Sequence, residues 1–359
     1  MLINGRHYRT IWLAEDKKTV EIIDQRFLPF EFIIEKINSS TEMAIAIKDM
    51  HLRGAPLIGA AAAYGMYLAT LEAINNKNEQ HIKNCSILLE NTRPTAVNLK
   101  WALNRVNAEL EKVSSIEEKI STAYKLAELI ADEDAETCRM IGVNGVSLIE
   151  EIYEKNGRRP VQILTHCNAG SLACVDFGTA TSPIYEAAKR KIPIHVWVDE
   201  TRPRNQGKLT SWELEQNKIP NTVICDNTGG YLMMKGMVDF VIVGTDRVTR
   251  NGDVANKIGT YLKALAANDN NIPFYVALPS STIDFNMESG DMIPIEERTQ
   301  DEVLTVDGLC KDKIEQVRLF SYYAKAANYG FDITPARLVT GFITEKGICK
   351  PQELLNFFD

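Results

Sequence analysis

The sequence has no excess of positive charge. Its 40 lysine and arginine residues stand against 48 aspartate and glutamate residues, which gives a formal net charge of -8. Nonspecific binding to nucleic acid or to an anionic membrane surface needs a positive field. We therefore expect neither a nucleic-acid partner nor a membrane partner. This balance leaves room for a local basic pocket that binds a small phosphate ester.

Paired cysteines and long apolar runs are also missing. The seven cysteines are odd in number and contain no CxxC pair, which fits a reducing compartment better than a disulfide framework. The N-terminus has no apolar signal core. The longest apolar stretch, "PLIGAAAAYGMYLA", is short, alanine-rich and interrupted by glycine, so we interpret it as a buried helix. We expect a cytoplasmic protein.

The familiar cofactor motifs are absent as well. There is no GxGxxG after a predicted strand and no GxxxxGK[ST], and we find no HExxH and no Cys/His spacing that by itself suggests a metal. Dinucleotide binding, a nucleotide P-loop and a zinc-peptidase centre therefore have no support in the sequence. We expect no cofactor and no metal.

The pattern of apolar residues predicts two domains. Residues 1–30 read as short alternating strands, and residues 40–155 have helical periodicity. After residue 156, apolar runs alternate with amphipathic segments; the runs are "VQILTHC", "IHVWVDE", "TVICDN", "VDFVIVGTD", "IPFYVALP" and "ARLVTGFI". This alternation is typical of an α/β fold with a mostly parallel, doubly wound sheet. We predict a mainly helical domain with a small strand element at 1–155 and an α/β domain at 156–359.

Polar residues gather where four of these strands are predicted to end. They are Thr165–Asn168, Asp199–Arg202, Asp226–Asn227 and Gly244–Arg247. Open α/β sheets bind ligands at this edge. Cys167 is therefore either a functional thiol or a small buried apolar residue. Neighbouring strand residues face opposite sides, which disfavours a reactive pair of His166 with Cys167 and favours a buried, hydrogen-bonded histidine.

Basic and amide side chains stand before several predicted helices. Arg53 precedes the small residues Gly54 and Ala55, and Arg93 precedes Pro94. Further along the chain stand Arg202, Arg204 and Gln206, and then Asn256 and Lys257. Each alone is most simply an exposed surface residue. Arginine suits phosphate oxygens and helix starts offer free N–H groups, so together they indicate a small anionic, hydroxyl-rich ligand such as a sugar phosphate.

Seven segments in order carry a resemblance to a known family. They are "RGAPLIGAAAAYG", "TRPTAVNLKWAL", "LTHCNAGSLA", "VDETRPRNQG", "GTDR", "NGDVANKIGTY" and "FYVALPSSTID". Over about residues 5 to 345 the sequence resembles the 5-methylthioribose-1-phosphate isomerases. That family is related to the regulatory subunits of initiation factor 2B and to ribose-1,5-bisphosphate isomerases. Many members have GADR where this chain has "GTDR".

The resemblance implies a fold, an activity and a set of site residues. It implies a helical N-terminal domain, a Rossmann-like C-terminal domain and a homodimer. The implied reaction is the aldose–ketose isomerisation of 5-methylthioribose 1-phosphate in methionine salvage, without metal or organic cofactor. The family's catalytic cysteine matches Cys167 and its proton-donor aspartate matches Asp246. Its substrate-binding residues match Arg53, Gly54, Ala55, Arg93, Gln206, Asn256 and Lys257.

The chemistry of such a substrate gives both catalytic residues a task. Carbon 1 carries phosphate on the anomeric oxygen, so the sugar ring does not open by itself. We hypothesise that Asp246, kept protonated by its apolar strand, gives a proton to the ring oxygen. Cys167 then acts as the base of a cis-enediol route or stabilises a hydride shift.

Two other functions are weighed against this one. The first is isomerisation of another pentose 1-phosphate, either 5-deoxyribose 1-phosphate or ribose 1,5-bisphosphate. The second is a noncatalytic regulatory subunit of the initiation factor 2B type. A regulatory subunit has no need of both Cys167 and Asp246, so their presence favours an enzyme.

Overall fold

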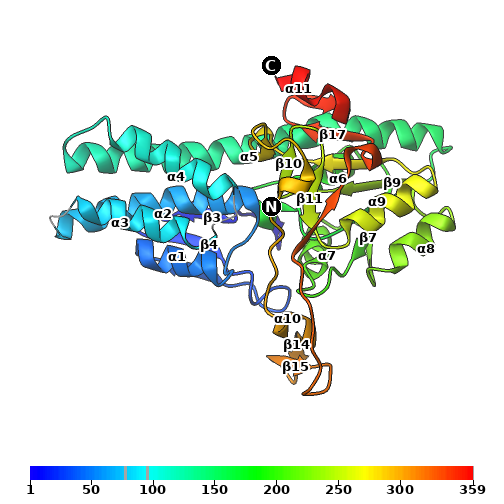
Figure 1. The fold of residues 1–359 in the computed structure, drawn as a ribbon, viewed down its shortest axis with the longest axis horizontal. Helices are drawn as coiled ribbons and strands as arrows, with labels where there is room; N and C mark the ends of the chain where they lie inside the picture. The colour runs from blue at the N-terminus through cyan, green and yellow to red at the C-terminus, as the bar shows by residue number, and fades with distance from the viewer. Residues whose placement is uncertain (77–78, 94–96, 359) are drawn as a thin grey trace. The chain divides into compact units, whose positions relative to one another are not determined.

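The computed structural model describes residues 1–76, 79–93 and 97–358 (Figure 1). Contacts group the chain into two compact units. Unit 1 holds Met1–Arg139 and Ser171–Gly178, and unit 2 holds Met140–Gly170 and Thr179–Asp359. Residues 140–155 thus group with unit 2, and the domain boundary that we place at residue 155 stays a prediction.

Unit 1 combines small antiparallel sheets with a layer of helices. Strands β3 (Ile11–Leu13), β4 (Val20–Ile23) and β5 (Ile34–Ile37) form one sheet, and β1 (Leu2–Ile3) pairs with β2 (Arg6–His7). The helices are α1 (Ser40–Lys48), α2 (Ala55–Asn76), α3 (Gln80–Glu90), α4 (Val97–Leu110) and the first part of α5 (Ile116–Lys155). The predicted helical region with a small strand element is confirmed.

Helix α2 forms the centre of unit 1 because its small residues admit close neighbours. A Cβ on Gly59 would lie 3.1 Å from the backbone oxygen of Asn98 on α4, and one on Gly65 would lie 3.0 Å from Leu89 on α3. The stretch Ala55–Ile74 is long and apolar enough to cross a membrane, but 83% of it is buried inside the protein. It is the core helix that the sequence predicts.

Unit 2 is built on a seven-stranded sheet in the order β18-β17-β12-β9-β6-β7-β8. All neighbours pair in parallel except the edge strand β18. The strands are β6 (Val161–Thr165), β7 (Ile194–Asp199), β8 (Asn221–Ile224), β9 (Phe240–Val243), β12 (Phe274–Ala277), β17 (Gly341–Thr344) and β18 (Gly347–Cys349). Every residue of β9 is buried, as expected for a central parallel strand.

The order of these strands defines where a ligand site is expected. The chain runs outwards from β6 through β7 to β8, then returns to the other side of β6 as β9 and continues through β12 to β17. This is the doubly wound, Rossmann-like order, and its direction reverses between β6 and β9. The predicted fold class is confirmed. Sheets of this kind bind ligands at the carboxyl ends of the strands that flank the reversal.

The remaining elements of unit 2 cover the sheet or form smaller structures. The helices are α6 (Ser182–Lys189), α7 (Gly207–Gln216), α8 (Thr228–Met234), α9 (Thr260–Asp269), α10 (Asp301–Leu304) and α11 (Leu354–Phe358). A second sheet has the order β13-β10-β11-β16, with strands Ile283–Asp284, Arg247–Thr249, Val254–Lys257 and Phe331–Thr334. Strands β14 (Thr305–Cys310) and β15 (Lys313–Arg318) form a hairpin.

A buried carboxyl in unit 1 makes stability depend on pH. The Oδ2 atom of Asp134, on α5, accepts the backbone N–H of Val175 at 2.6 Å. Burial raises the pKa of Asp134 from 3.8 to about 7. The folded state therefore binds the proton more tightly than the unfolded chain, and the stability that this proton contributes is lost as pH rises from about 4 to about 7.

We expect Asp134→Asn to weaken this dependence. The amide oxygen still accepts the Val175 N–H, but no charge forms on it. Between pH 5 and pH 8 the wild-type Tm is expected to fall by on the order of 2–5 °C more than the variant's Tm. Thermal unfolding at both pH values measures this difference. Parallel changes in the two proteins would contradict the assignment.

Candidate active site

Cys167 follows β6 in a backbone conformation that the surrounding loops impose. Its φ of 68° is left-handed, which costs a residue other than glycine ~1–2 kcal/mol. Its N–H donates to Oγ1 of Thr201 at 2.8 Å, and its carbonyl accepts the hydroxyl of Thr210, also at 2.8 Å. Strain of this kind concentrates at functional sites, so the fixed, half-buried thiol is a candidate catalytic group.

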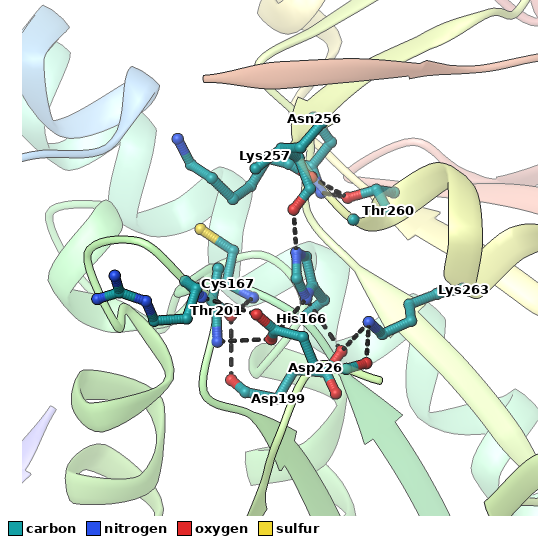
Figure 2. A network of polar contacts seen from close by, with 12 residues as sticks. His166, Cys167, Asp199, Thr201, Asp226, Asn256, Lys257, Thr260 and Lys263 are labelled. Atoms are coloured by element: carbon teal, nitrogen blue, oxygen red, sulfur yellow. Dashed lines mark hydrogen bonds and ion pairs between the residues drawn. The ribbon is translucent and has the colours of Figure 1, made fainter. Parts of the chain in front are cut away.

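The loop after β7 is fixed in turn by the loop after β8. Thr201 is also left-handed, with a φ of 62°, and its hydroxyl donates to the carbonyl of Asp199 at 3.0 Å. The Asp226 carboxylate accepts the N–H groups of Thr201 and Arg202 at 2.7 and 2.8 Å. Figure 2 shows these contacts in one network around Cys167. Asp226 thus acts as a positioning residue for the loop that holds Cys167.

His166, the neighbour of Cys167 in the chain, is buried, and both of its ring nitrogens have polar partners. Nε2 lies 2.9 Å from the carbonyl oxygen of Ile258, and Nδ1 lies 3.0 Å from Oδ2 of Asp199. Because neither nitrogen is left for the thiol, His166 does not pair with Cys167. The structure has the buried, hydrogen-bonded histidine that the sequence favours.

The same buried network already contains a cation. The Lys263 ammonium lies 3.2 Å from Oδ2 of Asp199, and it also donates to the backbone carbonyl of Asp226. His166, Asp199 and Asp226 form a group that is close enough to ligate a metal ion. The Lys263 ammonium already supplies the positive charge that a metal ion would bring to these carboxylates, so we assign no metal to this cluster.

Asp246 lies at the carboxyl end of β9, the strand next to β6. It is half-buried, and its N–H donates to the carbonyl of Ala255 at 3.0 Å. A Cβ on Gly244 would lie 2.6 Å from the Cβ of Ala169, so the loops after β6 and β9 meet where only glycine fits. Cys167 and Asp246 thus flank the point at which the strand order reverses.

Three predicted substrate-binding residues lie in unit 2. Gln206 caps α7, and its Oε1 is buried without a hydrogen-bond partner among the described residues. At the end of β11, buried Asn256 donates to the Thr260 hydroxyl at 3.0 Å. Lys257 donates to the carbonyl of Gly330 at 2.9 Å, and Figure 2 shows it on the side of the network toward which the Cys167 thiol points.

The other predicted substrate-binding residues lie in unit 1. Gly54 has a φ of 115°, and a Cβ there would overlap the carbonyl of Ala173, so this position requires glycine. Ala55 begins α2, and Arg53 donates from Nε to Oε1 of Gln25 at 3.4 Å. Arg93 is half-buried. The predicted helix start at Pro94 lies outside the described residues.

Sequence reasoning placed Thr201 in the polar segment Asp199–Arg202 but missed its contact with Cys167, and it missed the other side chains that hold the thiol loop in place. These are Thr210 and the fully buried Glu213, both on α7. The Glu213 carboxylate accepts the Asn168 amide at 2.9 Å and the Tyr185 hydroxyl at 2.8 Å. A glutamate among the apolar positions of "TSWELEQNK" was the one available signal.

Comparison with known proteins assigns the chain to a family. A model of the initiation factor 2 subunit family matches residues 51–351. A methylthioribose-1-phosphate isomerase from Desulfosudis oleivorans is 55% identical over 345 residues, which are 95% of this chain and 94% of that protein. A methylthioribose-1-phosphate isomerase from Escherichia coli is 53% identical over 351 residues, which are 97% of this chain and 94% of that protein.

Solved structures of similar proteins support the same family assignment. The 5-methylthioribose 1-phosphate isomerase from Pyrococcus horikoshii has a TM-score of 0.85 and 39% identity, covering 98% of this chain and 96% of that one. The delta subunit of translation initiation factor eIF-2B from A. fulgidus has a TM-score of 0.81 and 38% identity, and the match covers 97% of this chain and 98% of that one. The chain therefore belongs to the initiation factor 2 subunit family. Within it, the chain is an isomerase of the methylthioribose-1-phosphate isomerase family.

Proposed function

We propose that the chain converts 5-methylthio-D-ribose 1-phosphate into 5-methylthio-D-ribulose 1-phosphate in methionine salvage. The observation that carries this proposal is the position of Cys167 and Asp246 at the ends of the adjacent strands β6 and β9. Relatives 53–55% identical over almost the whole chain carry the name of this enzyme. We also expect a cytoplasmic homodimer.

The two residues have complementary roles in the proposed reaction. Asp246 protonates the ring oxygen, so that the ring opens although carbon 1 carries the phosphate. Hydrogen then moves from carbon 2 to carbon 1, either through Cys167 as base in a cis-enediol route or by a hydride shift that Cys167 stabilises. General acid–base assistance contributes ~100- to 10,000-fold per group, so both are central to turnover.

The binding residues divide by chemistry. In unit 2, Lys257 supplies charge for phosphate, while Gln206 and Asn256 hydrogen-bond sugar hydroxyls. The buried, unpartnered Oε1 of Gln206 is an acceptor suited to such a hydroxyl. Arg53, Gly54, Ala55 and Arg93 stay predicted substrate-binding residues of unit 1.

Turnover of pure substrates tests the proposal. We expect isomerisation of 5-methylthioribose 1-phosphate. Loss of the thioether in 5-deoxyribose 1-phosphate removes only apolar contact, which lowers kcat/KM by roughly 10- to 200-fold. Ribose 1,5-bisphosphate as the preferred substrate would replace the proposed one. No turnover of any of the three would favour a regulatory subunit, as the similarity to the eIF-2B delta subunit from A. fulgidus allows.

The Thr201 hydroxyl is expected to matter for turnover without touching substrate. Thr201→Val keeps the branched side chain but leaves the Cys167 N–H without its partner, which costs ~1–3 kcal/mol. We expect kcat to fall about tenfold or more, with KM changed much less. Steady-state kinetics measure both.

Thr201→Ser is the matched control, because it restores the hydroxyl at the same position. Its kcat is expected to return close to the wild-type value. If both variants were equally slow, the contact with Cys167 would not be the cause.

A further inference from the structure

A cluster of metal-binding side chain types lies in unit 1, among residues without a role in the proposed reaction. His81 and Cys85 are four residues apart on α3, so they share one face of that helix. Glu72 faces them from α2, and Ser40 from the start of α1. The helices thus bring together an imidazole, a thiol, a carboxylate and a hydroxyl.

The contacts converge on single atoms. Nε2 of His81 lies 2.6 Å from Oε2 of Glu72 and 3.3 Å from Sγ of Cys85. Oγ of Ser40 lies 2.8 Å from that same Oε2 and 3.1 Å from that same Sγ. A catalytic triad would use both ring nitrogens, one toward the thiol and one toward the carboxylate. Here one nitrogen faces both groups, as in the ligand shell of a metal.

This cluster differs from two other groups of acidic and histidine residues in whether a basic side chain neutralises its carboxylate. Asp199 has the Lys263 ammonium beside it, and Asp24 is paired with the Arg26 guanidinium at 2.6 Å. Glu72 has no lysine or arginine within ion-pair distance in the described part of the chain; its ion-pair partner is His81. Among those described residues, no basic side chain takes the position that a cation would occupy.

The spacing and the exposure also suit a metal ion. Zinc bonds of ~2.3 Å to sulfur and ~2.0 Å to nitrogen or oxygen put tetrahedral S···N and N···O distances near 3.5 and 3.3 Å. The Sγ–Nε2 distance of 3.3 Å is already close. Metal binding requires the 2.6 Å between Nε2 and Oε2 to widen, by a rotation of the Glu72 carboxylate about Oε1, which accepts the Ser40 N–H at 2.7 Å. The Glu72 and His81 side chains are 22% and 27% exposed, so the cluster opens to solvent.

We propose that Glu72, His81 and Cys85 bind one zinc ion, with Ser40 or a water molecule in the fourth position. A thiolate, an imidazole and a carboxylate together select a borderline-soft divalent cation. On binding, the Cys85 thiol releases its proton to solvent, and no electron is transferred. The ion joins α2 to α3, and α1 as well when Ser40 is the fourth ligand, and so stabilises unit 1. It takes no part in isomerisation.

Titration of the metal-free full-length protein with Co²⁺ tests this site. We expect one equivalent to produce the intense tetrahedral d–d bands and the near-ultraviolet thiolate-to-cobalt charge-transfer band, and Zn²⁺ to displace them. Cys85→Ser is expected to abolish the charge-transfer band. His81→Gln is expected to lower the affinity for Zn²⁺ by at least ~100-fold, since loss of even an outer partner costs 10- to 100-fold.

Cys225→Ser is the matched control, because Cys225 is an exposed thiol in unit 2. It is expected to keep the band, and Zn²⁺ is expected to raise the Tm of this variant and of the wild type but not of Cys85→Ser. Unchanged isomerase turnover in metal-free Cys85→Ser would show that the variant is folded. Absence of the band in the wild type, or its persistence in Cys85→Ser, would overturn the proposal.

Discussion

Asp246→Asn and Cys167→Ser are each expected to reduce isomerase turnover by ~100- to 10,000-fold. Asparagine keeps the shape of Asp246 but has no acidic proton to give the ring oxygen. Serine keeps the small side chain of Cys167, but a hydroxyl is a far weaker acid than a thiol and forms the anion much less readily. We expect the loss to appear in kcat and not in KM, because neither change removes a charge that we assign to phosphate binding. Initial rates on 5-methylthioribose 1-phosphate measure it.

Controls for this pair lie in the same unit. Cys225→Ser changes an exposed thiol, and Asp269→Asn changes an exposed carboxylate at the end of α9. Both are expected to keep turnover within about twofold of the wild type, as surface changes usually do. Turnover that survives in folded Cys167→Ser would make the cysteine a packing residue. Turnover that survives in Asp246→Asn would remove the proposed acid.

Gly54→Ala is expected to destabilise the protein by ~3 kcal/mol or more. A left-handed φ of 115° is itself unfavourable for alanine, and the added Cβ overlaps the backbone carbonyl of Ala173, which cannot rotate away like a flexible side chain. Urea unfolding measures the loss as a lower midpoint with an unchanged slope.

The variant Gly157→Ala separates the cost of the left-handed backbone from the cost of the steric overlap. Gly157 is also left-handed, with a φ of 75°, but a Cβ there meets nothing within 4 Å. This variant is expected to lose only the conformational part, ~1–2 kcal/mol. Equal losses in the two variants would mean that the Ala173 segment moves away without cost, and the close approach at Gly54 would not be a constraint.

The main sheet could be predicted from the sequence because its parallel strands are apolar and, except for the edge strand β8, mostly buried. The six apolar runs of the second half correspond to β6, β7, β8, β9, β12 and β17. The second sheet could not be predicted. Its strands β10 and β11 have only three and four residues and carry polar side chains, so no apolar periodicity marks them.

The residues of the candidate site also divide into those that the sequence predicts and those that it does not. Residues at strand ends, such as Cys167 and Asp246, could be placed by the rule that ligands bind at the carboxyl edge. The contacts that hold the thiol loop could not be predicted, even for Thr201, which lies in the polar segment Asp199–Arg202. Thr201 and Thr210 are 34 and 43 positions from Cys167, and Lys263 reaches Asp199 from another helix. Such contacts depend on strand order, which local patterns do not contain.

The short segment Ser171–Gly178 limits how the chain can be divided. It begins four residues after Cys167, leaves the sheet unit and contributes Val175 to the apolar core of unit 1 before the chain returns to unit 2. No single cleavage point therefore releases two intact halves. A fragment starting at Met140 would expose a piece of the other unit's interior, and a fragment ending at Arg139 would lack it. We therefore expect each fragment on its own to be less stable than the same unit in the intact chain.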